Sequence, residues 1–298
     1  MIEVEKRKPK VSVCVVTYNQ EEYITECLQS IVDQETDFEF EVIVCDDCST
    51  DKTRDIIKDF ASKHSNIRPV LRENNVGALV NFTDSHRMAD GKYICHMDGD
   101  DYWLQSKLQL QADFLDSNPE CNLVWTRLMF IRENEIKYDL IADPNFFKKK
   151  YFRGDIIKYI AIGTNSSHMY RSEDKIINLP NFDVIDYYAN VEKVGNGYAA
   201  FVSDEPLTAY RVGIGIATGS TNIVEIMHET MKFFRKKYPD NKSDLFSSSC
   251  LLFYSSLKRK RFKLAGKFFF LAISCFSFKG LAGFIQALRE YKMLRIPQ

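Results

Sequence analysis

The chain has 298 residues, of which 45% are apolar and 27% are charged, and its formal net charge is −1. This length and apolar content are sufficient for one large domain with its own hydrophobic core and a smaller appendage. A net charge near zero gives no basis for nucleic-acid binding or for an acidic interaction tail.

The first predicted element is a valine-rich strand, VSVCVV at residues 11–16, which runs into the polar residues Thr17, Tyr18 and Asn19. A short β-branched run that ends in polar residues is typical of a buried strand in a parallel sheet. Apolar residues then recur at three-to-four spacing over residues 23–32, which predicts a helix.

A second strand–helix pair follows the first. The run EVIVC at residues 41–45 predicts a strand, Asp46 and Asp47 begin the turn after it, and apolar residues within 56–60 mark a helix face. Repeated strand–helix units predict an α/β fold with a parallel sheet. Ligands of such sheets bind beyond the carboxyl ends of the strands, so we expect the polar residues after each strand to share one site.

The most acidic point of the chain follows a third predicted strand at residues 92–97. Asp98, Asp100 and Asp101 place three carboxylates within four residues, where they repel one another unless a cation lies close. Mn²⁺ and Mg²⁺ accept one or two protein carboxylates and complete their shell with water and substrate phosphates. The cluster therefore predicts a metal–diphosphate site, with a solvated acidic turn as the alternative.

Taken together, these motifs resemble an inverting family 2 glycosyltransferase with the GT-A fold, from residue 10 to residue 211. The resemblance is carried, in order, by VSVCVVTYNQ at 11–20, VIVCDDCSTD at 42–51, NVG at 75–77, GKYI at 91–94, DGDDYW at 98–103, KLQLQ at 107–111 and DEPLTAYR at 204–211. It implies an α/β catalytic domain over residues 1–215, with a mostly parallel sheet flanked by helices. Residues 216–298 would then form a helical C-terminal region.

An enzyme of this family moves a sugar from a nucleotide diphosphate to an acceptor hydroxyl. The resemblance implies that Thr17, Tyr18, Asn19 and Asp47 hold the nucleoside. Tyr18 would stack on the base, and Asp47 would accept a hydrogen bond from it, with helix capping as the alternative for the acidic pair at this turn. Asp98 would face the ribose.

The metal ligands are implied in the same way. Asp100 and Asp101 correspond to the carboxylates that reach Mn²⁺ or Mg²⁺, and the distribution of roles within the acidic cluster stays open. Arg211 would contact the diphosphate. Relatives usually carry a histidine two residues later, where this chain has Gly213, so we expect Arg211 to compensate for the missing histidine and Gly213 to lie in a mobile loop over the donor.

The acceptor base is implied to be an acidic residue at the start of a helix. Asp186, directly before Tyr187, fits best, and Asp183 is the alternative. A carboxylate base suits a single displacement, in which the acceptor hydroxyl attacks while the diphosphate leaves and the anomeric configuration inverts. A helix-capping role is the structural alternative for Asp186.

Three ring side chains near these motifs allow two interpretations. Trp103 follows the acidic cluster and would form either a sugar platform or a packing contact. His168 would contact the acceptor or lie in the core, and His96 is expected to be packed rather than to bind a ligand.

The charge is unevenly distributed along the chain. From residue 257 onward there are ten basic residues and one acidic residue, a net charge of +9, so residues 1–256 carry −10. The apolar run at 268–278 is too short to span a bilayer, which needs about 20 residues. A basic, aromatic-rich helical segment fits an anionic membrane surface. The alternative is a helix pair whose phenylalanines pack on the catalytic domain.

We therefore predict a metal-dependent inverting hexosyl- or N-acetylhexosaminyltransferase that uses a nucleotide sugar, first of all a UDP-sugar. The expected acceptor is a lipid-linked saccharide of bacterial surface polysaccharide, such as O-antigen or capsule. The charged first ten residues lack a signal-type apolar run, so we expect a cytoplasmic protein at the inner face of the plasma membrane, with reduced cysteines.

Two other functions compete with this prediction. A non-catalytic, membrane-associated module that only binds nucleotide sugars is the first. A nucleotide-sugar pyrophosphorylase is the second, but it requires a glycine-rich N-terminal loop with a basic residue, which residues 17–20 do not provide.

Overall fold

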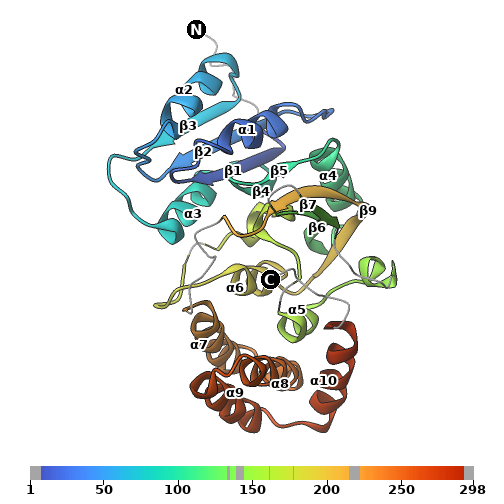
Figure 1. Cartoon of the computed structure of the whole chain (residues 1–298). Coiled ribbons are helices and arrows are strands. Elements are labelled where there is room, and N and C mark those ends of the chain that lie inside the picture. The colour runs from blue at the N-terminus through green and yellow to red at the C-terminus, as the bar shows by residue number, and fades with distance from the viewer. Residues whose placement is uncertain are drawn as a thin grey trace.

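The computed structural model describes residues 8–132, 135–138, 144–160, 162–176, 178–214 and 222–291. Within these ranges the chain forms one curled sheet with the strand order β3-β2-β1-β4-β8-β6-β9-β5, and β7 pairs with β6 outside this path (Figure 1). The strands are β1 (Val11–Thr17), β2 (Phe40–Asp46), β3 (Ile67–Leu71), β4 (Tyr93–Asp98), β5 (Tyr102–Trp103), β6 (Cys121–Arg132), β7 (Glu135–Tyr138), β8 (His168–Arg171) and β9 (Tyr198–Arg211).

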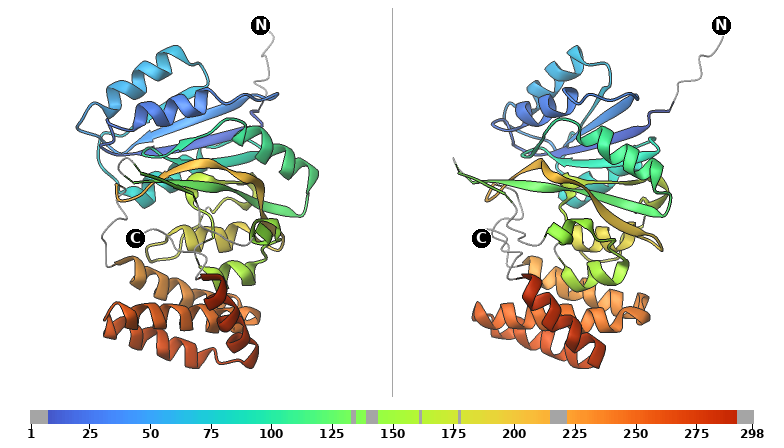
Figure 2. Two further views of the ribbon diagram at one scale, coloured as in Figure 1. Left: turned by 45° about the vertical axis from the view of Figure 1, so that its right-hand side comes forward. Right: turned by 90° about the vertical axis from the view of Figure 1, so that its right-hand side faces the viewer.

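Helices cover the sheet, and further helices form a layer at one end of the molecule (Figures 1 and 2). They are α1 (Ile24–Val32), α2 (Thr53–Lys63), α3 (Ala78–Arg87), α4 (Lys107–Ser117), α5 (Arg153–Tyr159), α6 (Asp186–Lys193), α7 (Asn222–Lys237), α8 (Lys242–Lys258), α9 (Phe262–Ser274) and α10 (Phe278–Tyr291). A short 3₁₀ turn, η2 (Asn165–Ser167), precedes β8. The predicted α/β fold is therefore confirmed.

The first half of the sheet forms because its central strand is apolar on both faces. Val11, Val13 and Val15 pack with residues of α1, α2 and α4, whereas Cys14 belongs to a second core on the opposite face. β1 pairs in parallel with both β2 and β4, and β2 pairs in parallel with β3. The parallel arrangement brings the carboxyl ends of β1, β2 and β4 to one edge.

The second half of the sheet is mixed. β8 is antiparallel to both β4 and β6, and β5 is antiparallel to β9, whereas β6 and β9 run parallel. The sequence prediction of a mostly parallel sheet is therefore right for the half from β3 to β4, but the sheet as a whole is mixed. Short β8 and β5 enter the other half with the opposite direction.

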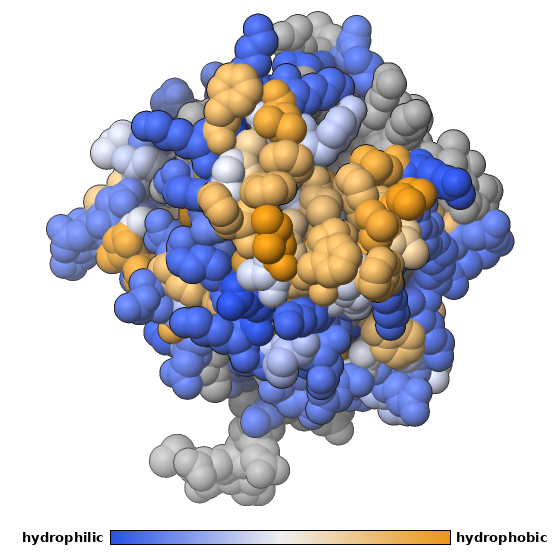
Figure 3. Space-filling model, turned by 90° about the horizontal axis from the view of Figure 1, so that it is seen from below, coloured by the Kyte–Doolittle hydropathy of each residue, from blue (hydrophilic) through white to orange (hydrophobic). Residues whose placement is uncertain are grey.

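Helices α7 to α10 form a layer at the end of the molecule away from α2 (Figures 1 and 2). Their inner residues join the same core as α5 and α6: Phe234, Leu245 and Phe268 are buried with Ile156 and Tyr187. The predicted boundary at residues 215/216 lies outside the described residues. Seen from below, the outer face of this layer carries a broad apolar area (Figure 3).

None of the helices in the described ranges combines the length and the apolar character needed to cross a bilayer.

Candidate active site

Three neighbouring strand ends meet where the sequence predicts a ligand. In the ladder Thr17 is paired with Asp46, and Val16 is paired with Asp98. The backbone N–H of Asp47 donates to the carbonyl of Thr17 at 3.0 Å. The polar residues after β1, β2 and β4 therefore lie side by side, as expected for the carboxyl edge of a parallel sheet.

The acidic turn packs directly on the end of β1. Gly99 N donates to the carbonyl of Val16 at 2.9 Å. A Cβ at Gly99 would lie 2.5 Å from Gln20 Oε1 and 2.8 Å from Thr17 Cβ, which no side chain tolerates without displacement. Glycine at this position is what allows the three carboxylates to approach the end of β1.

Asn19 joins the ends of β1 and β2. It adopts a left-handed backbone conformation with φ of 52°, which asparagine tolerates better than most residues. Its N–H donates to Ser49 Oγ at 2.9 Å, and its Oδ1 accepts from the N–H of Thr50 at 2.8 Å. Tyr18 is partly exposed beside it. Asn19 thus shapes the rim on which Tyr18 is presented.

Asp47 is buried and already accepts two hydrogen bonds. Its carboxylate oxygens receive the N–H groups of Val76 and Gly77 at 2.8 and 2.9 Å. Asp47 therefore holds the 75–77 loop against the strand ends, a role that the sequence did not suggest. Each carboxylate oxygen has a further lone pair, so Asp47 can still accept a hydrogen bond from the base. That contact stays a prediction.

Asp98 is the best-supported carboxylate of the acidic turn. His96 Nε2 lies 3.0 Å from its Oδ1, and Ser166 Oγ donates to its Oδ2 at 3.3 Å. Burial acts to raise the pKa of Asp98, but the charge and hydrogen bond of His96, together with the Ser166 hydroxyl, outweigh it and hold that pKa below its ordinary value. Asp98 is therefore kept as a carboxylate.

The folded chain disfavours the charged forms of Asp100 and Asp101. Burial, followed by repulsion from Asp98, raises the pKa of Asp100 to about 6. Burial and the charges of Asp98 and Asp100 likewise raise the pKa of Asp101 well above its usual value. Asp101 Oδ1 accepts from the N–H of Arg211 at 2.9 Å, whereas its buried Oδ2 has no hydrogen-bond partner among the described residues.

These properties fit a hard divalent cation. An unpaired buried carboxylate oxygen and two carboxyls with raised pKa values are stabilised by a nearby positive charge. Within the described residues no three acidic, histidine or cysteine side chains form a complete metal site. That is compatible with Mn²⁺ or Mg²⁺, which take one or two carboxylates and complete their shell with substrate phosphates.

Arg211 braces the acidic turn from β9. Its guanidinium donates to the carbonyl of Asp100, pairs with Glu26, and lies 4.9 and 5.2 Å from the rings of Tyr23 and Tyr102. The arginine is therefore held beside the predicted diphosphate position, and its contact with the diphosphate stays a prediction. In the predicted mobile loop, Gly213 has a φ of 96°, and residues 215–221 lie outside the described ranges.

Asp186 begins α6, as the sequence predicts for the base. Its carboxylate accepts from Asn165 Nδ2 at 2.6 Å and from the Asn165 N–H at 3.2 Å. Burial, followed by the charge of Asp98, raises the pKa of Asp186. The N-cap of the helix is Ile185, so the capping alternative does not describe this carboxylate. The other candidate, Asp183, is exposed to solvent.

The turn η2 connects Asp98 with Asp186. Asn165 contacts Asp186, and the next residue, Ser166, contacts Asp98. Trp103 is buried under this turn and donates its Nε1–H to the carbonyl of Ser166 at 2.7 Å, so it has the packing role and not that of a sugar platform. Sequence reasoning missed both η2 residues because nothing in their spacing relates them to Asp98.

A chain of buried hydrogen bonds supports Asp98 from behind. Tyr170 OH lies 2.7 Å from His86 Nδ1, and His86 Nε2 lies 3.0 Å from His96 Nδ1. His96 in turn contacts Asp98, so four side chains form one line from the core to the site. His96 is packed, as expected. Its contact with Asp98 was detectable, because residues two apart on a strand point to the same face.

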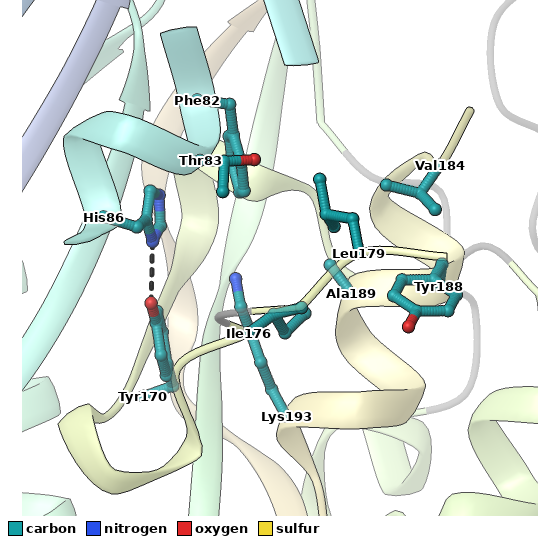
Figure 4. Close-up of a pocket in the computed structure, with 10 residues that line it drawn as sticks. All are labelled: Phe82, Thr83, His86, Tyr170, Ile176, Leu179, Val184, Tyr188, Ala189 and Lys193. Atoms are coloured by element: carbon teal, nitrogen blue, oxygen red, sulfur yellow. Dashed lines mark hydrogen bonds between the residues drawn. The ribbon is translucent and has the colours of Figure 1, made fainter. Parts of the chain in front are cut away.

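A small pocket lies beside these hydrogen-bonded side chains, between α3 and α6 (Figure 4). Lys193 reaches from α6 toward α3, and its Nζ lies 3.2 Å from His168 Nε2. Burial lowers the pKa of Lys193 to about 7. His168 is fully buried, so it has the core position and not that of an acceptor contact. The pocket is lined by Phe82, Thr83, His86, Tyr170, Ile176, Leu179, Val184, Tyr188, Ala189 and Lys193.

The arrangement defines a class of protein. Parallel strand ends that present polar groups, an acidic turn suited to a metal, and the half-buried carboxylate of Asp186, held by Asn165, are suited to bind a nucleotide diphosphate beside a hydroxyl group. These features are typical of enzymes that use nucleotide sugars.

Comparisons with known proteins agree with this class. Residues 12–176 match the model of "Glycosyl transferase family 2", more than half of the chain. An uncharacterized protein of Mycobacterium tuberculosis is 35% identical over 204 residues, which are 67% of this chain and 58% of that protein. The chain thus matches little more than half the length of that relative. The chain belongs to glycosyl transferase family 2.

Two further proteins show how this family is used. The Escherichia coli protein WfaP, named a UDP-Glc:α-D-GlcNAc-diphosphoundecaprenol β-1,3-glucosyltransferase, is 29% identical over 209 residues, 69% of this chain and 78% of WfaP. The crystal structure of S. aureus TarS 1-349 with UDP-GlcNAc superposes with a TM-score of 0.67 at 22% identity, over 96% of this chain and 81% of that one. The likeness to TarS shows that the fold is GT-A.

Proposed function

We propose that the chain is an inverting glycosyltransferase that moves a sugar from a UDP-sugar to a hydroxyl group of a lipid-linked saccharide in bacterial surface-polysaccharide biosynthesis. The observation that carries this proposal is the pair of side-chain contacts that η2 makes with Asp186 and Asp98. The consecutive η2 residues Asn165 and Ser166 hold Asp186 and Asp98, so an ionised carboxylate of the donor side and a basic carboxylate lie on either side of one short turn.

The donor is proposed to bind over the ends of β1, β2 and β4. Tyr18 offers a ring for the base, and Asn19 and Asp47 hold the backbone of this rim. WfaP is named for UDP-glucose, and TarS was crystallised with UDP-GlcNAc. These names support a uridine nucleotide and a hexose or N-acetylhexosamine as the transferred sugar.

Asp100 and Asp101 are the residues that would hold Mn²⁺ or Mg²⁺. When bound, the cation would offset the charge that develops on the departing diphosphate. Arg211, fixed between Asp100 and Glu26, would add a second positive group on the same side. Asp98 would remain available to the ribose, since its low pKa keeps it ionised.

Asp186 is proposed to remove the proton from the acceptor hydroxyl. Asn165 donates to both of its oxygens and so sets its orientation, while burial raises its pKa toward the range in which a carboxylate is an effective base. As the acceptor oxygen bonds to the anomeric carbon, the bond from that carbon to the diphosphate breaks. One displacement of this kind inverts the anomeric configuration.

The acceptor class is supported by WfaP, whose name specifies a sugar on diphosphoundecaprenol. A saccharide on such a lipid is presented at a membrane surface. The same reasoning makes the cytoplasmic face of the plasma membrane the proposed location of the enzyme.

The proposal is tested with UDP-glucose and UDP-GlcNAc, and a polyprenyl-diphosphate N-acetylhexosamine as acceptor, in the presence of Mn²⁺. Mass spectrometry should find one added sugar, and NMR should find the opposite anomeric configuration to that of the donor. Excess EDTA should abolish transfer. Donor binding without transfer to any acceptor would favour the non-catalytic module, and formation of UDP-sugar from UTP and a sugar phosphate would favour the pyrophosphorylase.

A further inference from the structure

The apolar segment at residues 268–278 has two faces in the folded chain. Phe268, Leu271, Ala272 and Cys275 are buried in the core that includes α5 and α6. The phenylalanines between and after them point outward: Phe270 is 71% exposed and Phe278 is 81% exposed. The packing interpretation is therefore confirmed for the inner face, and the membrane interpretation stays a prediction for the outer face.

The outward apolar side chains gather on the outer face of the C-terminal helices (Figure 3). We name this set the basal patch; it consists of Phe262, Phe269, Phe270, Ile273, Phe276, Phe278, Leu281 and Ile285. The rings of Phe269 and Phe270 lie 5.8 Å apart, and those of Phe276 and Phe278 lie 5.4 Å apart. A continuous apolar surface of this kind marks an interaction site on a soluble domain.

The surroundings of the basal patch are positively charged. Exposed cations flank it at Lys258, Arg259, Lys260, Lys263, Lys267 and Lys279. Residues 257–289 contain no aspartate or glutamate. Lys267 pairs with Glu225 at 3.2 Å, and no ion pair within the described residues involves the other five. The rim of the patch therefore carries uncompensated positive charge.

We propose that the basal patch is a docking surface for an anionic lipid bilayer. Exposed phenylalanines on α9 and α10 would enter the boundary between headgroups and acyl chains, and the lysines and arginine would lie against anionic headgroups. A second copy of the chain is a poorer occupant. Two-fold pairing through this patch would bring one positive rim against another, which disfavours association.

Point substitutions on the outer face are the appropriate test. Removal of the segment from residue 257 onward would also remove Phe268 and Leu271 from the core, so its effect on binding would not be separable from its effect on folding. Phe270 and Phe278 are exposed, so serine at both positions should leave the fold unchanged. Neither residue is part of the proposed catalytic site.

The first experiment is sedimentation of the full chain with phosphatidylcholine vesicles that contain or lack phosphatidylglycerol. Wild-type protein should bind the anionic vesicles, and part of this binding should persist in high salt because it is apolar. The variant Phe270→Ser/Phe278→Ser should lose roughly tenfold or more in the partition coefficient, given the apolar area removed. Ile136→Ser, at a 56% exposed position on β7, is the matched control and should bind like wild type.

The second experiment removes charge. Lys258→Gln/Lys260→Gln/Lys263→Gln should weaken binding to anionic vesicles by about fivefold for each cation that lies near the surface, with little effect on neutral vesicles. Lys58→Gln/Lys63→Gln on α2, at the opposite end of the molecule, is the control (Figure 1). Those two lysines form exposed ion pairs with Asp55 and Asp59, whose loss changes stability little.

Three results would overturn the proposal. Wild-type chain could fail to bind anionic vesicles, or it could bind while both the phenylalanine and the lysine variants bind equally well. Dimers that dissociate in Phe270→Ser/Phe278→Ser, without vesicle binding by wild type, would assign the patch to a second copy. Circular dichroism and UDP-sugar binding should be unchanged in every variant. The vesicle result does not depend on transfer, so it can fail or succeed independently of the proposed function.

Discussion

The proposed donor side and the proposed acceptor side of the site are held in place in different ways. The donor side follows the ends of β1, β2 and β4, which are neighbours in a parallel ladder, so backbone hydrogen bonds determine its position. The acceptor side is Asp186, positioned by Asn165 from a separate turn. Side-chain substitutions on the acceptor side should therefore change the rate of transfer and leave donor affinity unchanged. Changes to the packing of the strand ends should affect both the rate of transfer and donor affinity.

The largest effect should come from Asp186→Asn. Asparagine retains the size of the side chain but cannot take a proton, so transfer should fall by roughly 10²–10⁴-fold. Calorimetric affinity for the UDP-sugar should remain that of wild type, because no strand end is altered. Asp183→Asn, three residues away and exposed, is the control and should retain activity.

If Asp183→Asn is inactive and Asp186→Asn is active, the base has been assigned to the wrong carboxylate. If Asp186→Asn also loses donor binding, the two sides of the site are not separate in the way that the hydrogen bonds indicate.

The donor side should respond to pH and metal in a measurable way. Because the folded pKa of Asp100 is raised to about 6, its contribution to stability is present below the ordinary carboxyl pKa and is lost as pH rises through about 6. Metal-free protein should therefore lose up to about 3 kcal/mol of unfolding free energy from this group between acidic and neutral pH. Mn²⁺ should restore stability at neutral pH more than at pH 5.

Chemical denaturation of wild type and Asp100→Asn, with and without Mn²⁺, measures this effect. The variant should show a flatter pH dependence and a smaller gain from Mn²⁺. Equal stabilisation of both proteins by Mn²⁺ would show that Asp100 is not a metal ligand.

Gly99→Ala tests the packing of the acidic turn against β1. The new methyl group would lie 2.5 Å from Gln20 Oε1 and 2.8 Å from Thr17 Cβ, so the turn must shift at a cost of about 1–3 kcal/mol. Thermal unfolding should show the loss, and donor affinity should fall with it. Gly266→Ala, in α9 with no atom within 4 Å of the added Cβ, is the matched control and should be neutral or slightly stabilising.

The smallest expected effect concerns the buried histidines. His96→Ala removes the group that contacts Asp98 Oδ1, and a hydrogen bond to a charged group contributes about 1.5–3 kcal/mol. Donor affinity should fall by roughly tenfold as Asp98 loses its orientation. His168→Ala creates a similar buried cavity beside Lys193 but leaves Asp98 untouched, so it should reduce stability without this loss of affinity. Equal affinities in the two variants would remove the link between His96 and the donor.

The strand-end residues could be predicted because a local pattern specifies them. A β-branched run followed by Asn19, Asp47 or Asp98 indicates both the strand and the edge at which it ends. Asp186 could be located at a helix start only through the resemblance to the family. Its partner Asn165 and the contact of Ser166 with Asp98 join segments 21 and 68 residues apart, and no local pattern specifies such pairs.

Asp47 and Arg211 show the same difference between local and distant determinants within the proposed donor side. The resemblance to the family assigned Asp47 and Arg211 to the predicted donor site. The close approach of the 75–77 loop gave the Asp47 carboxylate two backbone donors, and the end of β9 placed Arg211 against Asp100 and Glu26.

The sequence by itself determined the α/β class, the edge of the sheet that carries the site, the acidic turn and the family, because strand periodicity and strand-end polarity are local properties. Tertiary structure decided which face of the segment at 268–278 is core and which is surface, how Tyr170 and His86 reach His96 behind Asp98, and how Asp98 and Asp186 are joined through η2. These depend on which distant segments pack together. That packing is a balance of burial over the whole chain rather than a property of any short stretch.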